Sequence, residues 1–77
     1  MKVEVFAKLK DFFEKEFEVT KPVQTIAELQ QHLAGINPTS VGVLDVCRFA
    51  VNDEFVHPEF ELKADEYVTV IPPSSGG

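Results

Sequence analysis

The chain has 77 residues, a length that suits one domain, and its 44% hydrophobic and 26% charged residues are typical of a globular protein. Its formal charge is −6, from 13 acidic and 7 basic side chains. A nucleic-acid-binding surface needs clustered basic residues, so this balance argues against nucleic acid as a partner. The charge favours a basic partner through long-range steering, although a role in solubility explains it equally well.

The sequence predicts a cytoplasmic protein. Cys47 is the single cysteine, so no internal disulfide can form, which fits a reducing compartment. The N-terminal stretch M-K-V-E-V-F has no apolar segment of the kind found in secretory signals. No apolar run approaches the roughly 20 residues needed to span a membrane, so we expect no membrane partner.

The first twenty residues predict two strands joined by a turn. Apolar and polar positions alternate over residues 2–9, which is typical of a half-buried strand. Its inward positions are Val3, Val5, Ala7 and Leu9. Phe6 interrupts the polar face of this strand. Residues 10–15 predict a turn or a single helical turn, and alternation over residues 16–20 predicts a return strand that completes a hairpin.

A helix is predicted over residues 25–34. Thr25 and Glu28 match a capping box, in which the Thr hydroxyl accepts from a backbone N–H and the Glu side chain reaches back to the cap. Apolar residues then recur with helical spacing at Ile26, Leu29 and Leu33. Gly35 is typical of the position just after a helix, so we expect the helix to end before it.

Three further strands are predicted in the second half of the chain. The segments in order are a loop with one helical turn over 36–46, a strand over 47–51, a short return strand over 54–56, a polar stretch with a turn over 57–66, and a last strand over 67–71. Asn37-Pro38 suits the start of the helical turn, whereas Gly42 argues against a long helix. Asn52-Asp53 predicts a tight hairpin turn in which Asp53 takes a positive φ.

The predicted order of elements, β-β-α-β-β-β, indicates an α+β fold. One main helix must pack on one face of a mixed sheet of about five strands. The first and last strands are expected to be parallel neighbours, connected by a right-handed crossover through the helix. This is the β-grasp arrangement of ubiquitin-like domains. We expect it over residues 1–71, followed by a C-terminal tail over residues 72–77.

The ending I-P-P-S-S-G-G is the strongest functional signal in the sequence. Pro72 and Pro73 cannot donate to a β-ladder, so they end the last strand and favour an extended conformation. Six residues at about 3.3 Å each give the tail a reach of roughly 20 Å. The residues with minimal side chains are Ser74, Ser75, Gly76 and Gly77. Such a tail suits a narrow channel in another protein, with its terminal carboxylate as the reactive group; the alternative is a frayed terminus or an expression scar.

Five stretches of the sequence match a known family. They are V-E-V-F-A-K-L-K, T-I-A-E-L-Q-Q-H-L, A-V-N-D-E-F-V, L-K-A-D-E-Y-V-T-V-I-P-P and the final S-G-G. Over nearly its whole length the chain resembles the small subunits of molybdopterin synthase, the MoaD-type sulfur carriers. The ending after the last strand is the most specific part of this resemblance. Thiamine-pathway sulfur carriers share the Gly-Gly end but resemble the rest of the chain less.

The resemblance implies a mechanism and two partners. An ATP-dependent activating enzyme adenylates the Gly77 carboxylate, and sulfur transfer then gives a C-terminal thiocarboxylate. The tail inserts into the large subunit of molybdopterin synthase, in a heterotetramer, and donates sulfur to a pyranopterin precursor to form the molybdopterin dithiolene. The family implies that this chain binds no cofactor and is not catalytic alone, because the activating enzyme uses the ATP and the large subunit supplies the acid–base residues.

An apolar patch beside the tail is expected to form the partner interface. The expected interface residues are Phe6, Lys10, Phe55 and Ile71. Ile71 faces outward if Val68 and Val70 face the core, which places it on the sheet surface at the tail root. The alternative is that these are scattered apolar residues of an ordinary surface. Lys10 stands where the family commonly has Arg, and Asp53 where Gly is common.

The other chemically capable residues are expected to be structural or exposed. Cys47 fits a small hydrophobe within a strand, and His32 and His57 lack the spacing of metal ligands, so no metal site is expected. No phosphate loop or nucleophile–base motif is present. The alternative functions are a sulfur carrier for thiamine or tRNA thiolation, a modifier joined through Gly77 to lysines of other proteins, and a plain binding module with an inert tail.

Overall fold

The fold is described from a computed structural model, which defines the structure of residues 1–73. Its elements are β1 (Lys2–Val5), the 3₁₀ helix η1 (Ala7–Asp11), β2 (Glu16–Glu18), α1 (Ile26–Ile36), the 3₁₀ helix η2 (Pro38–Ser40), α2 (Val41–Leu44), β3 (Arg48–Val51), β4 (Glu54–Val56) and β5 (Tyr67–Ile71). The predicted α+β class and the ubiquitin-like β-grasp arrangement are confirmed. Every predicted strand is present, although several are shorter than predicted.

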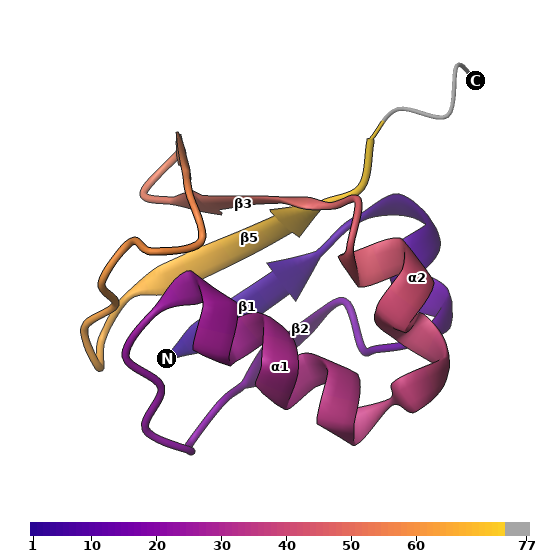
Figure 1. Cartoon of the computed structure of the whole chain (residues 1–77), viewed down its shortest axis with the longest axis horizontal. Helices are drawn as coiled ribbons and strands as arrows, with labels where there is room; N and C mark the ends of the chain where they lie inside the picture. The colour runs from indigo at the N-terminus through magenta and orange to yellow at the C-terminus, as the bar shows by residue number, and fades with distance from the viewer. Residues whose placement is uncertain (74–77) are drawn as a thin grey trace.

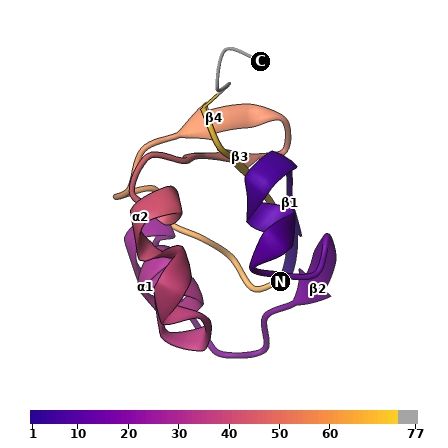
Figure 2. The same ribbon diagram turned by 90° about the vertical axis from the view of Figure 1, so that its right-hand side faces the viewer.

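The five strands form one mixed sheet in the order β2-β1-β5-β3-β4 (Figure 1). The first and last strands, β1 and β5, are parallel neighbours, as predicted, and Val3 pairs with Val68 in their register. The other three pairings are antiparallel. Figure 2 shows α1 and α2 on the same side of this sheet, so one face is covered and the other is open.

The core lies between the sheet and α1. Its completely buried apolar side chains are Val3, Val5, Leu9, Leu29, Leu33, Val68 and Val70. Full burial of each of these side chains contributes about 1.5–3 kcal/mol. The apolar residues that alternate along β1 and β5 therefore pack against the apolar residues spaced three and four apart on α1, as the sequence pattern predicts.

The first strand ends earlier than predicted. It stops at Val5, and Ala7 lies outside the core, exposed, with a φ of 54° at the start of η1. Leu9 is buried as predicted, but it reaches the core from a 3₁₀ helix whose Leu9 carbonyl accepts from the N–H groups of Phe12 and Phe13 at 3.0 Å. Alternation could not reveal this change, because positions 7 and 9 also fit a strand pattern.

The helix α1 begins as predicted and ends later. The Thr25 hydroxyl accepts from the Glu28 N–H at 3.2 Å, while the Glu28 carboxylate accepts from the N–H of Gln24, one residue before the cap, at 2.9 Å. The helix passes through Gly35, so the expected stop there is wrong. Asn37 ends it instead, because its side-chain amide donates to the Phe12 carbonyl at 3.0 Å and fixes the direction of the chain.

Residues 36–46 contain more helix than predicted. The expected helical start at Asn37-Pro38 is confirmed, with the Asn37 side chain accepting from the Thr39 N–H at 3.2 Å. Ser40 is completely buried, and its hydroxyl donates to the Asn37 carbonyl at 2.7 Å. A four-residue helix, α2, follows and includes Gly42. The hairpin turn is as predicted, with φ values of 51° at Asn52 and 68° at Asp53.

The N-terminus is held to β2 by an ion pair whose strength depends on pH. The Met1 ammonium lies 2.9 Å from Glu18 Oε2, and this hydrogen bond and charge lower the pKa of Glu18 from 4.5. A carboxyl whose pKa is lowered by folding adds stability above its unfolded pKa, and that stability is lost as the pH falls through the folded value. In untagged protein, Glu18→Gln is therefore expected to lower the urea midpoint at neutral pH but not well below pH 4.5.

The control for this experiment is Glu14→Gln, which removes an exposed carboxylate that makes no ion pair within residues 1–73. It is expected to leave the pH dependence of the urea midpoint unchanged. A difference between Glu18→Gln and the native protein that stays constant from neutral to acidic pH would contradict the role of this ion pair.

Candidate functional site

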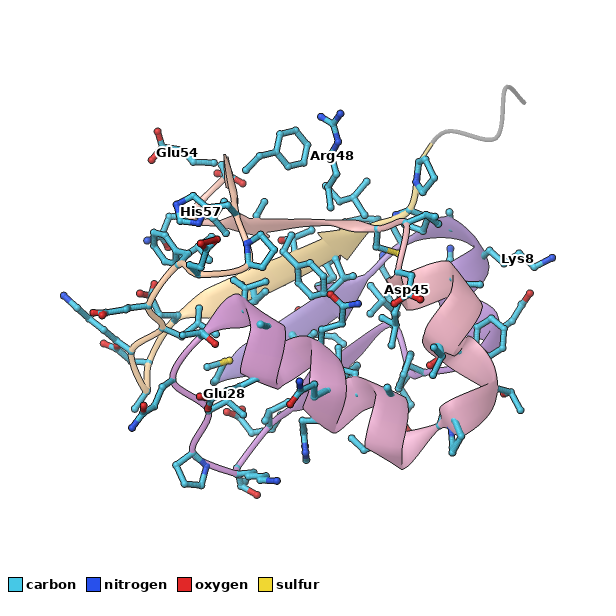
Figure 3. All side chains as sticks on the ribbon, in the orientation of Figure 1. Lys8, Glu28, Asp45, Arg48, Glu54 and His57 are labelled. Carbon is cyan, nitrogen blue, oxygen red and sulfur yellow. The ribbon has the colours of Figure 1, made fainter. Side chains whose placement is uncertain are left out.

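The open face of the sheet carries most of the predicted interface residues. We call it the outer face and define it by the side chains that alternate with the core residues along the strands: Lys2, Glu4, Phe6, Glu16, Glu18, Arg48, Ala50, Phe55, Tyr67, Thr69 and Ile71. Figure 3 shows Arg48 projecting from β3 on the side away from α1. This face is therefore the surface of the sheet on which a partner can lie.

Three of the four predicted interface residues lie on the outer face. Phe55 is 60% exposed and Phe6 is 36% exposed, while Ile71 is half-buried. Ile71 faces outward as predicted, because Val68 and Val70 are completely buried. Phe55 lies in β4, Phe6 directly follows β1, and Ile71 is the last residue of β5. The fold thus brings residues that are far apart in the sequence onto one face.

Lys10 lies elsewhere, on η1 rather than on a strand. It is exposed and makes no ion pair within the described residues 1–73. Because β1 and β5 are parallel and η1 follows β1, Lys10 lies at the end of the sheet from which the tail leaves. The structure thus places it at the border of the outer face and not within it.

The root of the tail lies at the same end of the sheet. Ile71 is the last residue of β5 and pairs with Arg48, the first residue of β3. Pro72 is half-buried and Pro73 is exposed, and the strand ends before them as predicted. Figure 1 shows the chain leaving the sheet here. The predicted tail residues Ser74, Ser75, Gly76 and Gly77 lie outside the described residues.

A hollow of about 520 Å³ lies on the outer face and extends along β5 from Tyr67, beside the β3–β4 turn, to Ile71 at the tail root. It is lined by Glu4, Phe6, Asn52, Asp53, Tyr67, Thr69 and Ile71. Two of the predicted interface residues, Phe6 and Ile71, thus belong to a concave site that also contains two carboxylates. The sequence pattern predicted the outward direction of Tyr67 and Ile71 but not this concavity.

The Tyr67 hydroxyl links three strands across the outer face. It lies 2.6 Å from Glu4 Oε1 on β1 and 2.8 Å from Glu16 Oε2 on β2. Hydrogen bonds to Glu4 and then to Glu16 raise the pKa of Tyr67 well above its usual value, so the hydroxyl stays protonated. Sequence reasoning missed this cluster, because only the register of the sheet brings the three residues together.

A second groove, of about 530 Å³, opens at the β4 edge and includes Cys47. The Cys47 Sγ donates to the Val43 carbonyl at 3.0 Å, and burial raises the pKa of this thiol to about 11. The thiolate is therefore scarce at neutral pH. Cys47 packs against the core as a small hydrophobe, but its predicted place within a strand is wrong, because β3 begins at Arg48. Nearby, the Arg48 guanidinium lies 5.5 Å from the centre of the Phe55 ring, a cation–π arrangement.

The described part of the chain contains neither a metal-ligand cluster nor a membrane-spanning helix. Within residues 1–73, no group of three or more His, Cys, Asp or Glu side chains is arranged to hold a metal ion. His57 is exposed and its Nδ1 lies 3.7 Å from Glu59 Oε1. Over the same residues, no helix has the length and apolar character needed to cross a membrane. The candidate site is therefore the outer face together with the tail root.

The fold and the site together place this protein in the class of β-grasp domains that have an open sheet face beside the root of a C-terminal tail. Comparison with known proteins identifies the family. The ThiS family model matches residues 3–77, and the chain belongs to this family. It is 37% identical to the molybdopterin synthase sulfur carrier subunit of Chlamydomonas reinhardtii, over 100% of this chain and 98% of that protein.

Solved structures that share the fold of this chain include these two. One is a complex of subunits 1 and 2 of the molybdopterin-converting factor from Helicobacter pylori, with a TM-score of 0.70, 25% identity, and coverage of 99% of this chain and 96% of that chain. The other is small archaeal modifier protein 1 from Haloferax volcanii, with a TM-score of 0.81 and 17% identity over 94% of both chains. The second likeness shows the fold alone.

Proposed function

We propose that this protein is the sulfur carrier subunit of molybdopterin synthase. The observation that carries the proposal is the full-length similarity to a sulfur carrier subunit, which extends through the C-terminal Gly-Gly, combined with a tail root at the border of an open sheet face. The Helicobacter complex supports a larger subunit as the partner. A cytoplasmic location and the absence of a cofactor on this chain belong to the same proposal.

The chemistry takes place at the Gly77 carboxylate, which is a poor electrophile until it is activated. An activating enzyme joins it to the AMP portion of ATP and releases pyrophosphate. Hydrosulfide (HS⁻) or its equivalent then attacks the carbonyl carbon and displaces AMP, and loss of the proton leaves a C-terminal thiocarboxylate. That sulfur attacks the pyranopterin precursor in the large subunit and displaces an oxygen substituent from it. Water then cleaves the bond between the sulfur and the Gly77 carbonyl, which restores the carboxylate and leaves the sulfur in the dithiolene of molybdopterin.

The described residues suggest how the carrier is held during this reaction. Phe6, Phe55 and Ile71 offer apolar surface to the large subunit and to the activating enzyme, and Lys10 adds a positive charge at the border. Pro72 and Pro73 set the direction in which the tail leaves the sheet. The tail residues Ser74, Ser75 and Gly76 then pass along the partner's channel. The acid–base residues of the reaction belong to the large subunit.

Two related functions use the same terminal carboxylate. A sulfur carrier for thiamine or tRNA thiolation would pass the thiocarboxylate to another acceptor. A protein modifier would join Gly77 to lysines through isopeptide bonds, and the fold shared with small archaeal modifier protein 1 is compatible with this second function. Both differ from the main proposal in the partner and not in the activation chemistry.

The test is to isolate the protein from its own host with an N-terminal tag and a free C-terminus. We expect a large subunit of molybdopterin synthase to co-purify in a heterotetramer. We also expect part of the C-terminal peptide to show, by mass spectrometry, the replacement of one oxygen by sulfur. A ladder of conjugated proteins without the thiocarboxylate would favour the modifier, and a thiocarboxylate without the large subunit would favour another sulfur pathway.

A further inference from the structure

The two carboxylates that line the hollow, Glu4 and Asp53, make no ion pair with a basic side chain within residues 1–73. The single Tyr67 hydroxyl hydrogen faces both Glu4 and Glu16, at 2.6 and 2.8 Å, and one hydrogen cannot satisfy two carboxylates. Lys2 Nζ, 3.7 Å from Glu16 Oε1, supplies a cation to Glu16. Within residues 1–73, no Lys, Arg or His nitrogen lies within 4.0 Å of a carboxylate oxygen of Glu4 or Asp53.

The same hollow has aromatic and apolar walls. Phe6 and Tyr67 are 36% and 37% exposed, and Ile71 closes the side nearest the tail root. Apolar walls together with carboxylates that have no basic partner match the chemistry of arginine. Its aliphatic stem packs on apolar surface, its planar guanidinium stacks on aromatic rings, and its five N–H donors bind carboxylates. A lysine fits less well, because its ammonium is a compact charge without a planar face.

We propose that this hollow receives an arginine side chain from the large subunit of molybdopterin synthase, the protein on which the carrier docks. The inference rests on the proposed function and adds the chemistry of the partner's contact. Charge complementarity supports it, because the hollow offers two acidic groups on a chain with a net charge of −6. Continuity supports it as well, because Ile71 both lines the hollow and directly precedes the tail. An arginine bound here orients the sheet face along which β5 runs to the tail root.

The test removes both charges without removing bulk, with the double substitution Glu4→Gln and Asp53→Asn. The Gln amide oxygen can still accept from Tyr67, and Asn tolerates the φ of 68° at position 53 at least as well as Asp. The matched control is Glu59→Gln with Asp65→Asn, which changes the net charge by the same amount. Both residues are exposed between β4 and β5, and neither lines the hollow. Calorimetry then measures Kd for the purified molybdopterin synthase large subunit and for the activating enzyme, at low and high salt.

We expect the double variant to bind the large subunit about tenfold more weakly at low salt, because each charge-assisted hydrogen bond contributes about as much as a tenfold change in Kd. The loss should shrink at high salt. Asp53→Asn alone, which leaves the Tyr67 contacts intact, is expected to give part of the loss. The control should stay within about twofold of the native Kd, since exposed charges away from the contact contribute little.

The outcomes separate this inference from the proposed function. Native protein that binds the large subunit, with equal Kd values for the double variant and the control, overturns the arginine contact and leaves the proposed function standing. A change confined to self-association, measured by sedimentation, would make a second copy of this chain the occupant and would also overturn it. Native protein that binds neither enzyme and forms no thiocarboxylate overturns both.

Discussion

A chain without Gly77 is expected to lose sulfur transfer to below detection, while it keeps its fold and its docking to the large subunit. The deletion moves the terminal carboxylate to Gly76 and shortens the arm by about 3.3–3.6 Å. A displacement of about 1 Å in an active site can already cost about 100-fold in rate, so the shortened arm cannot present its sulfur productively. The fold is unaffected, because all the core residues precede Pro72.

The measurement is molybdopterin formation by the reconstituted large subunit, with each carrier variant loaded by the activating enzyme. Gly77→Ala is the matched variant that keeps the length of the arm, and it is expected to retain part of the activity, because only a methyl group is added to a narrow passage. Sulfur transfer by the shortened chain at the native rate would refute the proposed role of the C-terminal carboxylate. Calorimetric Kd values near the native one would show that docking survives the deletion.

The architecture is predictable from the sequence because its signals are local and strong. Residues 67–71 alternate so clearly that Val68 and Val70 must face the core, which determines the outward direction of Tyr67 and Ile71. The capping pair before α1 and the helical spacing of its apolar residues are equally clear. Together with Pro72-Pro73, these features are sufficient to predict the tail root and most of the outer face.

The parts that sequence reasoning missed depend on contacts between distant segments. The chain turns at Ala7, with a φ of 54°, although alternation continues through that position. Gly35 lies within α1, because the Asn37 side chain and not the glycine determines where the helix ends. The cluster around Tyr67 requires the pairings of β1 with both β2 and β5. Alternation decides which face a side chain takes but leaves shifts of two residues open, so it could not predict that these three side chains meet.

Leu29→Ala is expected to be strongly destabilising, with a loss of about 2–5 kcal/mol in the free energy of unfolding. Leu29 is completely buried on the face of α1 that packs on the sheet, so truncation removes apolar contact and leaves a cavity. At roughly 0.05–0.15 kcal/mol per residue, a chain of this length has a total stability of only about 4–12 kcal/mol. Urea unfolding followed by circular dichroism measures the difference.

Gln31→Ala is the control, because it is an exposed position on the same helix and Ala has the highest helix propensity. Gln31→Ala is expected to leave the urea midpoint unchanged or to raise it slightly. A loss of less than about 1 kcal/mol in the free energy of unfolding for Leu29→Ala would contradict the core position of Leu29. Leu29 lies far in sequence from the tail, so sulfur transfer by Leu29→Ala should fall only in proportion to the fraction of the protein that is folded. The Gly77 deletion should instead abolish transfer in a fully folded chain, and this contrast separates the domain that docks from the terminal group that reacts.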